Sequence, residues 1–333
     1  MIDTKLINTT LIDKTLIDKT MKSKCILLIL AAAFTTAAFP ADPFSGRWDL
    51  TIVTPQGTYP SWMEVSDKDS STQVRIVGRV ASAHPATDVK LEGSRLSFTS
   101  SEHFGKPLKV TWEITAKGGK LSGVQKREDG VEGKLTGMHA PALDRKMPGA
   151  WNDPVALFNG KDLSGWEPLI TEQGKPPQNN WKAVNGELVN QAAGANIRTT
   201  AKFQDYKLHV EYNCPQDGNS GVYQRGRYEV QVEYEPTSSN DAAHGMGSIY
   251  GFIAPSQTLP KKPGQWETYD ITLVGRKVTV IRDGVKTIDN QEIPGITGGA
   301  LDSHEGEPGS IYIQGDHTGG MKYRNITIAT PKR

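Results

Sequence analysis

Three long polar side chains alternate along one predicted strand in the second half of the chain. Residues 228–233 read Tyr-Glu-Val-Gln-Val-Glu, so Glu229, Gln231 and Glu233 share one face and three apolar residues share the other. The apolar face is typical of a core. Two acids and an amide are costly on a sheet face unless their polar groups are satisfied. The strand, preceded by a turn at Gly226, therefore predicts the floor of a polar site that holds hydroxyl groups or transfers protons.

Other chemically active side chains stand near this strand or close to the end of the chain. His317 follows Asp316 at the exit of a predicted strand, so an imidazole and a carboxylate are neighbours there. Candidates for binding a substrate by stacking, by donating protons or by positive charge are Tyr223, Arg225, His244 and Tyr250. The structural alternatives stay open: a turn histidine capped by Asp316, a solvated loop around His244, and ion pairs within the sheet.

No motif identifies a cofactor. A set of Glu, Gln and His side chains could hold a hard divalent ion such as Ca²⁺ or Mn²⁺. The acidic loop 302–307 is a second candidate for Ca²⁺, with a solvated loop as the alternative. Nucleotide binding is disfavoured because Gly245-x-Gly247 lacks a third glycine and a following helix. No Gly-x-Ser-x-Gly nucleophile turn occurs.

The elements that must position these residues are predicted to be strands. The 34 glycines and 20 prolines separate short runs that alternate apolar and polar residues, which favours an all-β protein. Runs spaced by about ten residues between Phe44 and Ala142 predict an up-and-down sheet or a small antiparallel barrel. A dozen short strands from Val155 to the end predict two stacked antiparallel sheets, a jelly-roll-like sandwich.

The domain organisation follows from these composition shifts. Residues 1–20 contain a five-residue tandem repeat and are interpreted as a spurious or disordered extension; residues 21–41 are a predicted signal peptide. An accessory β-domain is predicted over 42–142, a Pro-rich linker over 143–153, and the sandwich over 154–333. The mature protein is expected to be exported, to the periplasm or beyond, without a transmembrane segment.

Charge and cysteine content exclude several classes of partner. Thirty-eight basic residues balance 37 acidic ones, so nothing indicates binding to nucleic acid. Of the two cysteines, Cys25 lies in the leader, which leaves Cys214 alone and excludes an intrachain disulfide in the mature chain. The oligomeric state is not indicated.

The second module resembles the 3-keto-disaccharide hydrolase domain family. The matching segments are residues 157–166 (Leu-Phe-Asn-Gly-Lys-Asp-Leu-Ser-Gly-Trp), 219–223 (Asn-Ser-Gly-Val-Tyr), 228–231 (Tyr-Glu-Val-Gln), 266–271 (Trp-Glu-Thr-Tyr-Asp-Ile), 315–317 (Gly-Asp-His) and 323–326 (Tyr-Arg-Asn-Ile). The resemblance implies a concanavalin A-like lectin/glucanase sandwich with a carbohydrate site on its concave sheet. It also implies cleavage of glycosides that are oxidised at C3.

Two mechanisms compete for such a site. On a flat strand Glu229 and Glu233 lie about 13 Å apart at Cα, whereas a retaining glycosidase needs carboxyl groups about 5–5.5 Å apart. Glucanases of the same fold carry acid-x-acid-x-acid, and Gln231 replaces the middle acid here. We therefore expect removal of the C2 proton of a 3-keto glycoside, loss of the C1 substituent and later hydration, with Glu229, Glu233 and His317 as catalytic residues. The alternatives are an ordinary retaining hydrolase using Glu229 and Glu233, and a non-catalytic carbohydrate-binding protein.

Overall fold

The computed structural model describes residues 42–68, 71–80, 82–103, 107–169, 178–234 and 241–332. They belong to one compact unit, Pro40–Arg333. Within these ranges the chain is built of strands, and the one helical segment there is the 3₁₀ turn η1 Ala242–His244. The predicted all-β class is confirmed. The predicted extension 1–20 and signal peptide 21–41 lie outside the described residues. No helix in the described ranges is long and apolar enough to cross a membrane.

The first module is a nine-stranded antiparallel sheet that nearly closes into a barrel. Its spatial order is β4-β3-β2-β1-β9-β8-β7-β6-β5, so β1 pairs with both β2 and β9. The strands are β1 Gly46–Thr54, β2 Gly57–Lys68, β3 Ser71–Val77, β4 His84–Pro85, β5 Thr87–Glu92, β6 Arg95–His103, β7 Pro107–Lys117, β8 Lys120–Arg127 and β9 Glu132–His139. This topology is the predicted up-and-down arrangement.

The barrel core follows from strict alternation along its strands. In β7 every second residue is buried, from Leu108 to Ala116, and the residues between them are exposed. Trp48 is fully buried in the same core, and its indole Nε1 donates to the backbone oxygen of Phe44 at 2.7 Å. A buried indole N–H needs such a partner. Trp48 is therefore a structural residue of the barrel core.

The second module contains two antiparallel sheets. The larger sheet consists, in spatial order, of β12 Trp181–Val184, β13 Glu187–Asn190, β22 Met321–Ala329, β15 Tyr206–Asn213, β18 Trp266–Val274, β19 Lys277–Arg282 and β20 Val285–Glu292, with β10 Val155–Ala156 paired to β22. The smaller sheet consists of β11 Trp166–Pro168, β14 Ile197–Thr199, β21 Tyr312–Ile313, β16 Asn219–Gln224 and β17 Tyr228–Glu233. The β12–β13 hairpin turns on Asn185 and Gly186, both with positive φ (51° and 83°), as an Asn-Gly turn requires.

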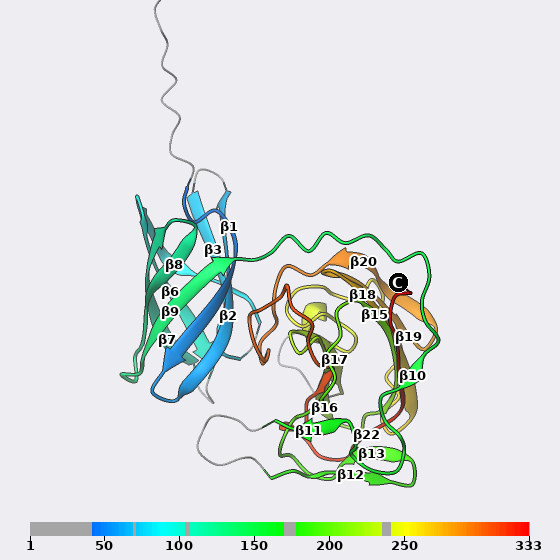
Figure 1. The fold of residues 1–333 in the computed structure, drawn as a ribbon. Helices are drawn as coiled ribbons and strands as arrows, with labels where there is room; N and C mark the ends of the chain where they lie inside the picture. Colours follow the sequence, from blue (N-terminus) through cyan, green and yellow to red (C-terminus); the bar gives the residue numbers. More distant parts are fainter. Residues whose placement is uncertain are drawn as a thin grey trace, which may run out of the picture. The chain divides into compact units, whose positions relative to one another are not determined.

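The core of this module lies between its two sheets. One continuous cluster joins Val210 and Ile271 of the larger sheet to Val222, Val230 and Ile313 of the smaller one. Figure 1 shows β15, β18 and β22 on one side of this core and β16 and β17 on the other. The predicted jelly-roll-like sandwich is confirmed. Because β17 turns its apolar residues to this core, its polar residues face away from it, on the outer face of the smaller sheet.

The chain between the two modules is bonded to the sandwich rather than free of it. The guanidinium of Arg145 donates to the carboxylate of Asp205 at 3.2 Å. Farther along, Trp151 forms an isolated antiparallel bridge with Pro331. These contacts hold residues 143–153, the predicted linker, along the edge of the sandwich.

Candidate active site

A cavity of about 660 Å³ lies over the outer face of the smaller sheet. Six of the nine predicted site residues line it: Tyr223, Glu229, Gln231, Tyr250, Asp316 and His317. Strand alternation explains the contribution of β16, where Asn219 and Tyr223 point to the cavity while Val222 points to the core. The structure therefore brings most of the predicted residues together on one surface.

The β16–β17 hairpin sets Tyr223 directly opposite Glu229. The two residues form a cross-strand pair, and the phenol oxygen of Tyr223 lies 2.8 Å from Glu229 Oε2. The turn at the tip of the hairpin contains Arg225 and Gly226, both with positive φ. Glu229 and Gln231 are each only 3% exposed, so the predicted polar floor of the site is almost entirely covered.

The Tyr223 hydroxyl also lies 2.8 Å from the backbone oxygen of Gly298. A hydroxyl carries one hydrogen and can donate it fully to only one of two acceptors. The Gly298 oxygen can only accept. Both contacts are satisfied when Tyr223 donates to Gly298 and a protonated Glu229 donates to Tyr223. The geometry therefore favours the neutral, acid form of Glu229.

Burial acts in the same direction on Glu229. Loss of solvent is the main cause that raises its pKa to about 8, and the negative charges of Asp316 and Glu233 add to this effect. The charge of His317 opposes this effect, as does the Tyr223 hydroxyl when it donates to an ionised Glu229 instead of to Gly298. At neutral pH Glu229 is thus suited to giving a proton away.

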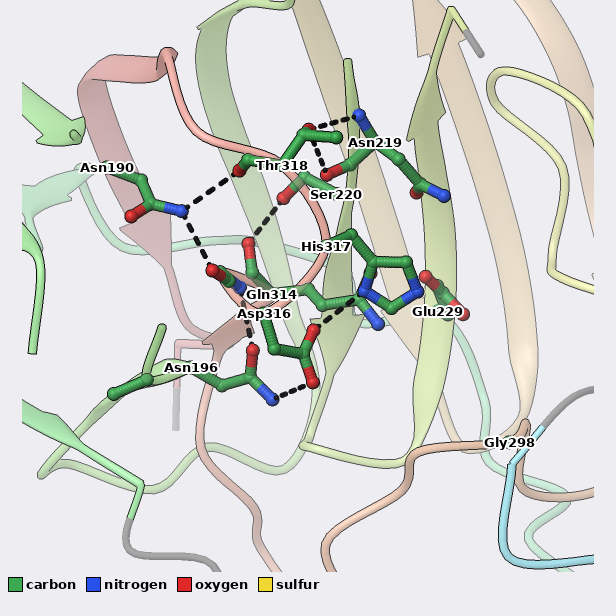
Figure 2. Close-up of polar contacts among 12 residues, drawn as sticks. Asn190, Asn196, Asn219, Ser220, Glu229, Gly298, Gln314, Asp316, His317 and Thr318 are labelled. Carbon is green, nitrogen blue, oxygen red and sulfur yellow. Dashed lines mark hydrogen bonds and ion pairs between the residues drawn. The ribbon is translucent and has the colours of Figure 1, made fainter. Parts of the chain in front are cut away.

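His317 is oriented by a chain of two side chains. Its Nδ1 lies 2.7 Å from Asp316 Oδ1, and Asp316 Oδ2 accepts a hydrogen bond from Asn196 at 3.2 Å (Figure 2). Asn196 Oδ1 accepts from the backbone N–H of Gly315, which fixes the direction of its amide. Burial raises the pKa of Asp316, but the hydrogen bond and charge of His317 and the bond from Asn196 hold it below its ordinary value. An ionised Asp316 keeps the Nδ1 proton of His317 on its own side.

The loop that carries His317 is fastened to the neighbouring strands. Asn190 donates to the backbone oxygens of Gly315 and Thr318, and Thr318 Oγ1 accepts from the N–H of Asn219 at 2.8 Å (Figure 2). At the start of the loop, Ser220 donates to the backbone oxygen of Gln314. These bonds fix the backbone that presents a half-exposed His317 to the cavity.

The resulting site pairs a base with an acid. In Figure 2 the ring of His317 points toward the carboxyl of Glu229, and the two groups interact electrostatically. With Nδ1 protonated toward Asp316, the Nε2 atom is the basic nitrogen of the ring. The arrangement can remove a proton with one residue and supply a proton with the other.

Three predicted site residues do not line this cavity, and Arg225 is the clearest correction. It is 1% exposed, and its guanidinium donates to the Tyr228 hydroxyl at 3.1 Å and to the backbone oxygen of Gly275 at 2.7 Å. The tip of the hairpin turns this side chain into the protein. Arg225 therefore braces the turn, and its charge does not face the site.

The other two lie beside the site. Glu233 accepts from Gln231 Nε2 at 3.3 Å and lines a separate cavity of about 260 Å³. Glu229 and Glu233 thus face different cavities. His244 Nε2 lies 2.8 Å from Ser82 Oγ, and its ring meets the ring of Tyr250 edge to face. His244 supports Tyr250, which does line the site.

The family model described as the 3-keto-alpha-glucoside-1,2-lyase-like domain matches residues 153–329, more than half of the chain. The chain belongs to this family. The match confirms the resemblance expected for the sandwich over residues 154–333. A comparison with curated proteins gives no match.

Several solved structures resemble this member of the 3-keto-alpha-glucoside-1,2-lyase-like family. Two are candidate glycosyl hydrolases from Parabacteroides distasonis ATCC 8503. One is 30% identical, covering 53% of this chain and 83% of its own, with a TM-score of 0.43. The other is 19% identical, covering 53% and 92%, also with a TM-score of 0.43. SCLam, a non-specific endo-β-1,3(4)-glucanase, is 12% identical over 56% of this chain and 95% of its own, with a TM-score of 0.35.

Sequence reasoning missed parts of the site of this lyase-like domain. Asn196 directly precedes β14 and Tyr312 lies in β21; both line the cavity, and Asn196 donates to the Tyr312 hydroxyl at 2.9 Å, but no local pattern distinguishes either from a structural residue. Gly221 could have indicated the site from the sequence, because a glycine inside a strand often marks a place where another group lies close to the backbone. The barrel residues Tyr59 and Arg79 also line the cavity, and no local pattern indicates that.

The acidic candidates for a metal ion are engaged elsewhere. Glu305 is fully buried and bonds both the Tyr228 hydroxyl and Arg276, while Asp302 accepts from Arg227. Loop 302–307 is thus an arginine-paired structural element. Among the residues that the structure describes, no three His, Cys, Asp or Glu side chains are grouped as a metal ion would require. A Ca²⁺ or Mn²⁺ requirement stays an untested expectation.

We expect a Gly221→Ala variant to fold but to lose most of its activity. A Cβ atom at this position would overlap Glu229 Oε1, and the nearest atoms all belong to that one side chain. The carboxyl must swing away from Tyr223, at a folding cost of about 1–3 kcal/mol. Turnover and thermal unfolding are measured beside Gly149→Ala, whose Cβ would meet nothing within 4 Å. Wild-type turnover in Gly221→Ala would contradict the placement of Glu229.

Proposed function

We propose that this protein cleaves 3-keto glycosides by elimination across C1 and C2, followed by hydration. The observation that carries the proposal is the pairing in one cavity of His317, oriented by Asp316, with a Glu229 whose acid form is favoured. Membership of the 3-keto-alpha-glucoside-1,2-lyase-like family supports the same substrate class.

In the proposed steps His317 and Glu229 each take up one proton and each give up one proton. A C3 ketone acidifies the proton on C2, and His317 Nε2 takes that proton to leave an enolate. The enolate collapses to a C1–C2 double bond while the bond from C1 to the leaving oxygen breaks, and Glu229 protonates that oxygen. Water then adds at C1, giving its proton to Glu229, while His317 returns a proton to C2. The sum is hydrolysis, with both residues restored.

The developing charge in this route falls on the C3 oxygen. Side-chain amides of Asn219, Gln231 and Gln314 line the cavity, and neutral N–H donors of this kind stabilise an enolate oxygen. Tyr250, whose pKa is raised to about 12 mainly by burial, stays a neutral donor through the working range. Retaining hydrolysis is disfavoured because Glu229 and Glu233 face different cavities.

The test compares a 3-keto glucoside with its unoxidised parent in D₂O. We expect turnover of the 3-keto compound alone, with deuterium at C2 of the released sugar, because C2 loses and regains a proton. Product incubated without protein controls for spontaneous exchange, and a chelator arm reports any need for a metal ion. Turnover of the parent, or release without deuterium, would support retaining hydrolysis instead. Binding without turnover would indicate a carbohydrate-binding protein.

A further inference from the structure

The barrel contributes one wall of the cavity over the sandwich. Thr58, Tyr59 and Pro60 of β2, and Arg79 and Val80 just after β3, line the same cavity as Glu229 and His317. These residues lie well over one hundred positions before the catalytic pair in the chain. The cavity is therefore a composite of the two modules.

This wall is fixed by buried contacts. Trp62 and Val77, which belong to barrel strands β2 and β3, are part of the hydrophobic core cluster of the sandwich and are 0% and 1% exposed. The N–H of Gly299 donates to the backbone oxygen of Arg79 at 3.3 Å, and Ser82 Oγ bonds the ring of His244. The barrel segment is thus held against the cavity at several points.

The lining changes character from the sheet to this wall. The strands of the smaller sheet and the loop after β21 contribute amides, carboxyl groups and phenols. Of the apolar side chains in the lining, Pro60 and Val80 belong to the wall, and Leu169, Ala300 and Leu301 belong to loops of the sandwich. The wall also carries the polar side chains of Thr58, Tyr59 and Arg79. Val80 is 40% exposed although it lines a cavity. Exposed apolar surface at the rim of a polar pocket suits an apolar ligand group.

We propose that the barrel wall is the leaving-group subsite and that it takes an aromatic aglycone rather than a second sugar. An aromatic ring against Val80 and Pro60 removes apolar surface from water. A second sugar would place hydroxyl groups against Pro60 and Val80, whose side chains cannot bond them, which is costly. The guanidinium of Arg79 lies 5.9 Å from the Tyr59 ring centroid. It adds a positive charge at the edge of the wall where the aromatic ring of the ligand would bind. This inference rests on the proposed function.

The test varies the wall and the leaving group together. Val80→Asn replaces the exposed apolar group by an amide. Val53→Asn, a 51% exposed valine on β1 that does not line the cavity, is the matched control. The substrates are a 3-keto phenyl glucoside and a 3-keto glucosyl-glucose. We expect Val80→Asn to lower kcat/KM for the phenyl compound about tenfold and to leave the disaccharide within about twofold. Val53→Asn should change neither.

A binding arm separates this inference from the proposed function. Calorimetry with unoxidised phenyl glucoside and cellobiose repeats the comparison without any turnover. If neither keto compound is cleaved, the proposed function fails, yet a selective tenfold loss of phenyl glucoside affinity in Val80→Asn still supports the subsite. A wild type that prefers the disaccharide, or a Val80→Asn effect equal on both ligands, overturns the aromatic subsite.

Discussion

Replacing His317 by alanine is expected to lower kcat on a 3-keto glycoside by about 10²–10⁴-fold, the usual contribution of a positioned base. The variant loses the only imidazole lining the cavity among the described residues. Because the side chain is 44% exposed, its removal should leave thermal unfolding unchanged. Loss of deuterium uptake at C2 in parallel with turnover would identify the missing step as removal of the C2 proton.

Asp316→Asn tests the orientation of the imidazole separately. An amide at this position can donate to Nδ1 and so stabilise the opposite tautomer, which turns Nε2 into a donor. We expect a loss of kcat with little change in KM. Full C2 exchange in His317→Ala, or unchanged kcat in Asp316→Asn, would remove this pair from the mechanism.

Glu229→Gln is expected to abolish cleavage of poor leaving groups while retaining the fold. A glutamine keeps the shape and can still bond Tyr223, but it has no proton to give to the leaving oxygen. A 4-nitrophenolate leaving group needs little acid assistance. The Glu229→Gln variant should therefore cleave the 4-nitrophenyl 3-keto glucoside about 10²-fold or more faster, relative to wild type, than it cleaves an alkyl 3-keto glucoside. Equal losses on both substrates would argue against an acid role for Glu229.

The pH dependence of Glu229 gives a second measurement. Its pKa is about 8 in the folded protein against 4.5 ordinarily, so the wild type binds an extra proton when folded. The associated stability is complete below about pH 4.5 and is lost as pH rises through about 8. Glutamine does not titrate, so the Glu229→Gln variant does not lose this stability. The difference in free energy of unfolding, variant minus wild type, should therefore increase as the pH rises from about 4.5 to about 8. In the wild type, kcat/KM should fall above about pH 8.

Much of the fold follows from local sequence patterns. The Asn185-Gly186 and Asp283-Gly284 turns fix their hairpins because both residues of each pair adopt positive φ, and strict alternation sets the two faces of β17. Glu229 could be found in this way, since its position depends on the strand that contains it. The hairpin around Arg225 was also predictable as a turn.

Other parts of the site depend on long-range contacts that local patterns do not contain. The side chain of Arg225 is directed inward by Tyr228 and by the Gly275 backbone, 50 positions further on. Asn196 acquires its role from Asp316, 120 positions away. The barrel wall is set by how two separate cores meet, which no strand pattern determines.

One peptide group, between Gly298 and Gly299, connects Tyr223 in the site to Arg79 in the barrel by hydrogen bonds. The carbonyl of Gly298 accepts from Tyr223, and the N–H of the same peptide, on Gly299, donates to the backbone oxygen of Arg79 in the barrel. A peptide plane is rigid, so a displacement of Arg79 rotates the oxygen on which Tyr223 depends. The proton affinity of Glu229 and the position of the barrel wall are then thermodynamically linked. If a ligand bound at the barrel wall shifts the pKa of Glu229, then by reciprocity the affinity of that ligand must change when Glu229 ionises.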